Sequence, residues 1–252
     1  MNLPTAAEML DSMASRYGEC VAYCDAGVCK CTVTRAGLGG DPLTIIVDFS
    51  TEFSRGKLLR FEFEGRCRGQ PGFSSHWLIS GEAGAPPVRT VYPYAAKNCR
   101  DLESALAEAD TPSMGVASII PMILAASHTR EKLELLFGGV ALRGEENVQG
   151  NLCYEMGDEE VCGGIGGKKL RKLWVEKESK LICRVDAVSL FDVRRAVSVA
   201  KSRRDRLVHE GLYSGMSRDA IESVLGKLSG SAESPISEKR QSIIYHSRFD
   251  EL

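Results

Sequence analysis

Cysteine is the reactive residue type that this chain carries in unusual number, with nine in 252 residues. Four of them, Cys20, Cys24, Cys29 and Cys31, lie close together near the N-terminus. Structural zinc sites usually pair two Cys-x2–4-Cys hooks that lie apart in the sequence. Here the spacings are x3, x4 and x1 inside one predicted hairpin, which spreads the thiols over both faces. We therefore expect no metal site and no cofactor.

Two pairs of cysteines are candidates for disulfide bonds. Cys24 and Cys29 lie opposite each other if the Ala-Gly pair between them forms a hairpin turn. Cys153 and Cys162 do so if the Gly-Asp pair between them forms one. Directly opposed strand positions have the Cα separation that a disulfide requires, given compatible side-chain directions. In a reducing compartment the same residues would be ordinary small hydrophobic strand residues.

The glycine-rich run from Gly163 to Lys169 looks at first like a phosphate-binding loop. A P-loop requires Gly, four further residues, Gly-Lys and then Ser or Thr. Cys162 stands at the first glycine position and Lys169 at the final Ser/Thr position, so the pattern fails at both ends. We expect a loop between two strands.

The four histidines, His76, His128, His209 and His246, are scattered along the chain. None has a nucleophile in a recognised motif nearby, so we expect no catalysis. A hydrolase that uses a cysteine or serine is the alternative, because catalytic partners need not be adjacent in sequence. It would be recognised by a Cys or Ser within hydrogen-bond reach of a histidine that a carboxylate orients.

Charge and hydropathy argue against several classes of partner. A formal net charge of −2 gives the whole molecule no long-range attraction to nucleic acid. No run reaches the ~20 apolar residues of a membrane-spanning helix. Residues 1–16 lack the basic start and apolar core of a signal peptide, so we expect a cytoplasmic protein, or a periplasmic or envelope-associated one if a leader was removed. The basic run Arg194–Arg206 predicts a solvated helix face or, alternatively, a site for an acidic protein partner or a lipid headgroup.

The elements that would position these residues follow from periodicity. Leu59, Phe61 and Phe63 alternate with charged residues, which places the apolar set on one face of a strand. Amphipathic and buried helices are predicted over 5–17 and 116–126 respectively. Further predicted helices cover 101–109, 193–210 and 217–228, and predicted strands cover 21–25, 28–35, 43–49, 57–64, 76–80, 88–92, 140–142, 152–156, 160–162, 170–176, 180–185 and 241–249.

The ordered motifs resemble the LolA-like family of lipoprotein-sorting and lipid-binding proteins, most closely a poorly characterised bacterial branch of it. The motifs are Tyr23-Cys-Asp-Ala-Gly-Val28, Phe49-Ser-Thr-Glu-Phe-Ser-Arg55 with Leu59-Arg-Phe-Glu-Phe63, Ser104-Ala-Leu-Ala, Gly115-Val-Ala-Ser, Pro121-Met-Ile-Leu, Leu142–Tyr154 and Leu173–Val185. The resemblance covers residues 5–188. We divide the chain into a LolA-like β-rich domain over 1–190, a helical addition over 191–230, and a linker with a possible final edge strand over 231–252.

The resemblance implies an α+β fold, with a large antiparallel sheet curled into a half-barrel and helices on its concave side. It also implies a hydrophobic cavity that accepts acyl chains, and hence non-enzymatic binding of a lipid or lipoprotein acyl chain. A regulatory sensor that binds a protein partner, or a structural domain with no ligand, are the other functions that stay open. The expected cavity residues are Leu59, Phe61, Phe63, Trp77, Ile79, Ile119, Ile120, Ile123 and Leu173 or Trp174.

Overall fold

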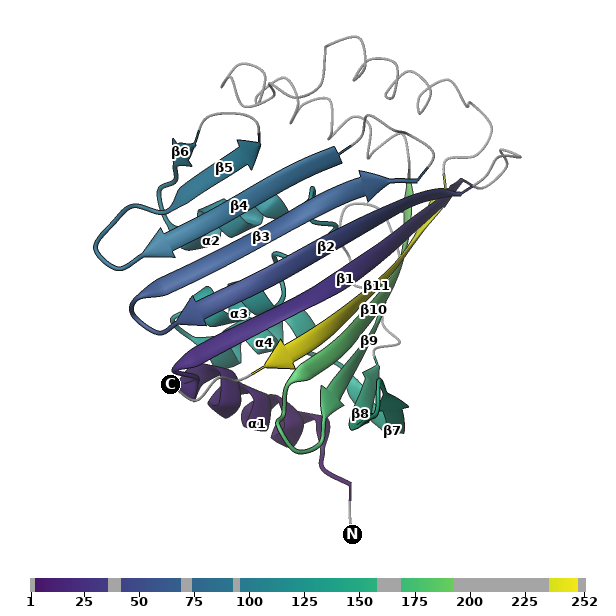
Figure 1. Ribbon diagram of the computed structural model, residues 1–252. Helices are drawn as coiled ribbons and strands as arrows, with labels where there is room; N and C mark the ends of the chain where they lie inside the picture. Colours follow the sequence, from purple (N-terminus) through teal and green to yellow (C-terminus); the bar gives the residue numbers. More distant parts are fainter. Residues whose placement is uncertain are drawn as a thin grey trace.

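The computed structural model describes residues 3–35, 42–68, 74–92, 96–157, 169–192 and 236–248. Within these ranges an eleven-stranded antiparallel sheet has the strand order β6-β5-β4-β3-β2-β1-β11-β10-β9-β8-β7. The sheet curls, and α2, α3 and α4 lie on its concave side (Figure 1). The expected α+β half-barrel is therefore confirmed. The strands are β1 (Ala22–Arg35), β2 (Leu43–Ser54), β3 (Leu58–Cys67), β4 (Ser74–Glu82), β5 (Val88–Tyr92), β6 (Lys97–Asn98), β7 (Ala141–Val148), β8 (Asn151–Gly157), β9 (Lys169–Glu176), β10 (Ile182–Asp192) and β11 (Ile236–Arg248).

The N-terminal helix α1 (Ala6–Glu19) is fixed at both ends. Thr5 and Glu8 form a capping box, in which the Thr5 hydroxyl accepts from the Glu8 amide and the Glu8 carboxylate accepts from the Thr5 amide at 2.7 Å. At the other end, the Arg55 guanidinium donates to the carbonyls of Tyr17 and Cys20, both at 2.8 Å. A cation near the C-terminal carbonyls also complements the helix dipole. The Phe-x-Thr-x-Phe-x-Arg motif thus locks α1 against the sheet.

The predicted hairpin between residues 21 and 35 is wrong, because β1 is one continuous strand. It pairs along its length with β2 on one side and β11 on the other, and these two ladders leave no place for a turn. Cys24 and Cys29 therefore lie five positions apart in one strand, where an odd separation puts them on opposite faces. Side chains on opposite faces of one strand cannot be joined by a disulfide, so the expected bond between Cys24 and Cys29 does not form. Cys153 is a free thiol, and Cys162 lies outside the described residues.

The last strand, β11, is a central strand and not the edge strand that we expected. It lies between β1 and β10 and pairs antiparallel with both. We expected the strand over 241–249, and it begins five residues earlier, at Ile236. The strand joins the strands of the N-terminal half of the chain to those of the C-terminal half, and only long-range pairing decides that.

The helical cover on the concave side differs in part from the prediction. α2 (Leu102–Asp110) is as expected, with Asp101 as its N-cap. The predicted helix over 116–126 is helical only over α3 (Ile120–Ala125), because Pro121 in its first turn favours a helix start there. α4 (Thr129–Phe137) was not predicted. The predicted helices over 193–210 and 217–228, with the basic run Arg194–Arg206, lie outside the described residues.

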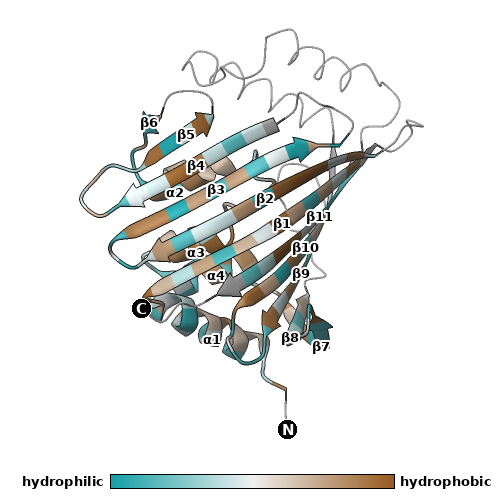
Figure 2. Cartoon of the chain, viewed as in Figure 1, coloured by the Kyte–Doolittle hydropathy of each residue, from teal (hydrophilic) through white to brown (hydrophobic). Residues whose placement is uncertain are grey.

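The core lies between the concave sheet face and the helices. Inward residues alternate with exposed ones along β2 and β3, as the period of two requires. Figure 2 shows the resulting alternation of apolar and polar bands along these strands. Met9, Met13, Leu106, Ile123 and Leu133 complete the core from the helical side. None of the described helices has the length and hydropathy needed to cross a membrane.

Candidate functional site

The strand register aligns the inward side chains of the concave face into two cross-strand rows. In each row, one residue of each strand lies directly beside its partner on the next strand. We name them the charged row and the aromatic row. The charged row is Asp25, Thr51, Phe61, Ile79 and Arg89, on β1 to β5. The aromatic row is Tyr245, Gly27, Phe49, Phe63 and Trp77, on β11 and β1 to β4.

The middle of both rows is apolar and densely packed. The ring centroids of Phe61 and Phe63 lie 5.5 Å apart, and Trp77 stacks on Phe63 at 5.8 Å with an interplanar angle of 15°. Ile120 and Ile123 of α3 belong to the same core cluster. The structure thus brings together the expected residues of this face with those of its helical cover: Leu59, Phe61, Phe63, Ile79, Ile119, Ile120 and Ile123 are buried in one cluster, and Trp77 packs against it. Whether they line a ligand cavity stays a prediction.

Trp174 lies on the other face of the sheet, so it does not join this cluster. Its neighbour Leu173 points inward and is part of the core, as the alternation of side chains in β9 requires. Trp174 belongs to a small separate cluster with Val148, Cys153 and Cys183. Its indole Nε1 donates to Glu146 at 2.8 Å, and the Arg184 guanidinium lies 4.6 Å from its ring centroid.

Arg89 ends the charged row on β5 and has partners on two sides. Only 6% of its side chain is exposed, and its guanidinium forms an ion pair with Glu108 of α2. It also lies over the Trp77 ring, 5.5 Å from the centroid. The pair attaches α2 to β5, next to the edge strand β6, and neutralises the buried cation.

Asp25 ends the charged row on β1 and has much less support. The residue is 3% exposed, and its Oδ2 accepts a hydrogen bond from the Tyr23 hydroxyl at 2.7 Å. Its other oxygen, Oδ1, has no partner at hydrogen-bond distance in the part of the chain that the structure describes. Desolvation raises the pKa of Asp25 to about 6, against weaker opposing effects of Tyr23 and Thr51. The Thr51 hydroxyl and backbone amide lie near enough on β2 to act on this carboxylate as hydrogen-bond donors, and they oppose the rise of its pKa.

Sequence reasoning missed both charged ends of this face. Asp25 was visible as the acidic residue of the Tyr-x-Asp-x-Gly motif, at the same parity as Tyr23 and Cys29. The incorrect hairpin prediction hid that pattern, because it divided the strand. Arg89 gave no signal in the sequence, since a single Arg within a five-residue strand is normally on the solvent face.

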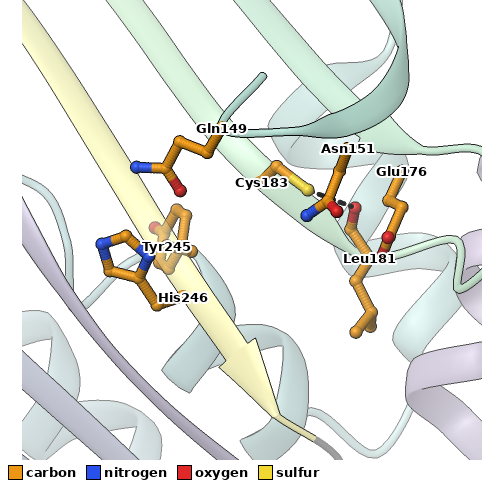
Figure 3. A pocket seen from close by; sticks show the side chains of 7 residues that line it. All are labelled: Gln149, Asn151, Glu176, Leu181, Cys183, Tyr245 and His246. Carbon is orange, nitrogen blue, oxygen red and sulfur yellow. Dashed lines mark hydrogen bonds between the residues drawn. The ribbon is translucent and has the colours of Figure 1, made fainter. Parts of the chain in front are cut away.

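An open pocket of about 320 Å³ lies where β10 and β11 separate. Their pairing ends at Arg184 and Ile244, and β10 carries an irregularity between Ile182 and Arg184. The residues around the pocket come from β9, β10, β11 and the turn between β7 and β8 (Figure 3). They are Gln149, Asn151, Glu176, Leu181, Cys183, Tyr245 and His246.

Cys183 and His246 line this pocket together, so it is a place where the hydrolase alternative would have a nucleophile and a base. The Cys183 thiol points to the Leu181 carbonyl at 3.8 Å, and burial raises its pKa to about 12. A thiol with this pKa supplies almost no thiolate at neutral pH, so it is not an activated nucleophile. His76, another candidate base, is held by Glu62 at 2.7 Å and stacks on Tyr92. Three-residue clusters of metal-ligating side chains are absent from the described part of the chain.

Comparison with known proteins returns solved structures alone: no family model and no curated protein matches the chain. A DUF1329 family protein from Desulfovibrio piger is 13% identical, over 97% of this chain and 92% of that one, with a TM-score of 0.33. A domain from Vibrio parahaemolyticus described as an outer membrane lipoprotein-sorting protein is 10% identical over 97% and 94%, with a TM-score of 0.34. A LolA superfamily protein from Nitrosomonas europaea is 7% identical over 99% and 96%, with a TM-score of 0.29. The assignment of the fold rests on the strand topology described above.

Proposed function

We propose that this protein is a non-enzymatic carrier that binds a lipid or lipoprotein acyl chain between the concave sheet face and its helical cover, in the periplasm or cell envelope. The observation that carries the proposal is the continuous apolar surface formed by Phe61, Phe63, Trp77 and Ile79 beneath α3. The motif resemblance to LolA-like proteins supports the same ligand class.

The construction of the cover is suited to admitting a chain. α2, α3 and α4 have 9, 6 and 9 residues, too few to be stable helices without their packing on the sheet. Residues with positive φ lie between α2 and α3, at Met114 and Gly115, and directly after α4, at Gly139. An acyl chain that replaces helix side chains against Phe61 and Phe63 would keep the apolar surface covered, and each Å² buried stabilises the complex by about 25 cal/mol.

The two tryptophans supply a direct test, because they lie on opposite faces of the sheet. Trp174→Phe leaves Trp77, which packs against the proposed site, and Trp77→Phe leaves Trp174 in the outer cluster. The probe is an acyl chain brominated near its middle, since bromine quenches indole fluorescence only at close range. It is prepared with three ends: a glyceryl ester, an alcohol and a carboxylate.

At least one of the three probes should quench Trp77 in the Trp174→Phe protein in a saturable manner. The same probe should leave Trp174 unquenched in the Trp77→Phe protein. If none of the three quenches Trp77, or if quenching is equal at both tryptophans, the carrier proposal is wrong. Native mass spectrometry of protein purified from its own envelope, with a lipid bound, would support it independently.

A further inference from the structure

Two cysteine thiols lie together on the outer face of the sheet, away from the concave core. Cys153 of β8 and Cys183 of β10 are 0% and 7% exposed, and both belong to the outer cluster around Trp174. Each thiol is near enough to act on the pKa of the other. Their hydrogen bonds to the backbone are long, from Cys153 to the Asn151 carbonyl at 3.5 Å and from Cys183 to the Leu181 carbonyl at 3.8 Å, and Figure 3 draws the second.

The path of β10 brings the two thiols together. Cys153 on β8 lies opposite Glu176 of β9, and β10 pairs with the other side of β9. The register between β9 and β10 is regular above Arg184 and shifts at Cys183. Such irregularities change the direction of a side chain. The Cys183 side chain is buried in the outer cluster with Cys153, although the strands of the two residues are not neighbours.

A disulfide does not fit this arrangement. β8 and β10 lie on either side of β9, so their backbones are two strand spacings apart, or about 9.6 Å. The Cα atoms of a disulfide usually lie within about 7 Å of each other. An ion bonded to both sulfur atoms spans more, because two metal–sulfur bonds of about 2.3 Å separate the sulfurs by up to about 4.6 Å.

The number and type of the donors select the ion. Thiolates are soft ligands that favour Cu(I), which accepts two of them. Structural zinc takes four ligands, and groups of three or more metal-ligating side chains are absent from the described part of the chain. Glu146 and Glu176 act on the Cys153 thiol from nearby, and their negative potential attracts a cation.

The ion has a route from solvent, because Cys183 lines the open pocket of about 320 Å³ where β10 and β11 separate (Figure 3). We propose that Cys153 and Cys183 bind one Cu(I) ion between their sulfur atoms. The ion replaces the two thiol protons, which leave to solvent, and no electron is transferred. The bound group then carries one negative charge, and Arg184 and Lys172, whose cationic groups lie over the Trp174 ring, offset part of it.

This inference goes beyond the carrier proposal and does not depend on it. The expectation of no metal site came from the spacing of the N-terminal cysteines. Cys153 and Cys183 lie far apart in the sequence and become neighbours only in the fold.

The two tryptophans report where the ion binds, with all cysteines unchanged. Cu(I) is supplied without oxygen as its acetonitrile complex, and it quenches an indole only when it is bound close by. One equivalent should quench Trp174 in the Trp77→Phe protein, because Trp174 belongs to the same cluster as both thiols. It should leave the emission of Trp77 in the Trp174→Phe protein unchanged. Equal quenching of the two tryptophans, or no quenching of Trp174, would show that the inference is wrong.

Cysteine variants test the ligands themselves, in competition with a chromophoric Cu(I) chelator. Cys153→Ala and Cys183→Ala should each weaken binding at least about a hundredfold, since loss of a ligand costs more than loss of an outer partner. Cys29→Ala is the matched control, because Cys29 is an equally buried strand thiol in the concave core. It should leave the affinity unchanged.

Two results from these proteins would contradict the site. One is an affinity that survives both Cys153→Ala and Cys183→Ala, or that falls equally in Cys29→Ala. The other is recovery of Cys153 and Cys183 as a disulfide-linked peptide from protein purified in air, which would mean that the two strands approach more closely than two spacings allow.

Discussion

Two charged side chains are buried on the concave face of this sheet, at opposite ends of one cross-strand row, and they are treated differently. Arg89 on β5 has an ion pair with Glu108 and lies over a tryptophan ring, although its Nε has no partner at hydrogen-bond distance among the described residues. Asp25 on β1 has a hydrogen bond from Tyr23 and lies near the donors of Thr51, but it has no counter-charge in the described part of the chain. Since neighbouring strands lie ~4.8 Å apart, four strand spacings put the two about 19 Å from each other.

The difference separates a buried charge that has a counter-ion from a buried charge that has none among the described residues. A buried ion stabilises a fold only when its partners compensate for the lost hydration. Glu108 does this for Arg89 and links α2 to the sheet. No cation among the described residues compensates Asp25 for its lost hydration, and burial raises the pKa of its carboxyl group. Phe61 and Ile79 lie between the two charged residues in this row and form the apolar surface that separates them.

The largest expected effect concerns the packing around Asp25. In Gly27→Ala the new Cβ would overlap the carbonyl oxygen of Ile244 and the ring of Phe49, so backbone or ring must move. We expect a loss of more than about 3 kcal/mol in the free energy of unfolding, measured by chemical denaturation. Gly81→Ala on β4, the strand next to that of Arg89, is the control, because its new Cβ meets the flexible Leu102 side chain at 3.2 Å. Equal losses at the two positions would contradict the rigid packing around Asp25.

The second effect is a dependence of stability on pH that originates at Asp25. Its pKa is about 6 in the folded protein against an ordinary value of 3.8, so the folded state binds more protons between these values. Its contribution to stability is present below about pH 4 and is lost as the pH rises through about 6. Asp25→Asn removes this loss, and should stabilise the protein by on the order of 2–3 kcal/mol at about pH 8.

The same variant should differ little from the parent at about pH 3, where Asp25 is mostly protonated in both states because this pH lies below 3.8 and below about 6. Denaturation curves at the two pH values measure the difference directly. An Asp25→Asn protein that is less stable than the parent at about pH 8 would mean that the carboxylate has a compensating partner, and the contrast with Arg89 would disappear.

The smallest effect concerns the paired end of the row. Glu108→Gln keeps the shape of the side chain and removes its charge, which leaves the Arg89 guanidinium buried without a counter-charge. Because the Glu108 side chain is 40% exposed, solvent screens part of the effect, and we expect a loss of about 1–2 kcal/mol. Denaturation at neutral pH measures it. The exposed pair Arg240–Glu238 is the control, and Glu238→Gln should change stability by less than about 0.5 kcal/mol.

The sequence by itself determined the local elements and the parity of the concave face. Alternation placed Phe61 and Phe63 on one side of β3, and Thr5 and Asp101 marked the starts of two helices. Such features depend on neighbours a few residues away, so a single stretch of chain contains the information. The ordered motifs then suggested a curled sheet beneath helices, and the strand topology confirms it.

Only the tertiary structure decided which strands lie side by side and which charges are compensated. A turn was expected in the middle of β1, where Ala-Gly is a favourable dipeptide, but the ladders with β2 and β11 keep the strand extended. The same pairing makes β11 a central strand. It also places Asp25 directly opposite Thr51, and two positions along β1 from Gly27, which is the partner of Tyr245. Whether a buried charge has a counter-charge depends on how separate elements pack, as when Glu108 of α2 meets Arg89 of β5 from 19 positions along the chain, and no local pattern records that.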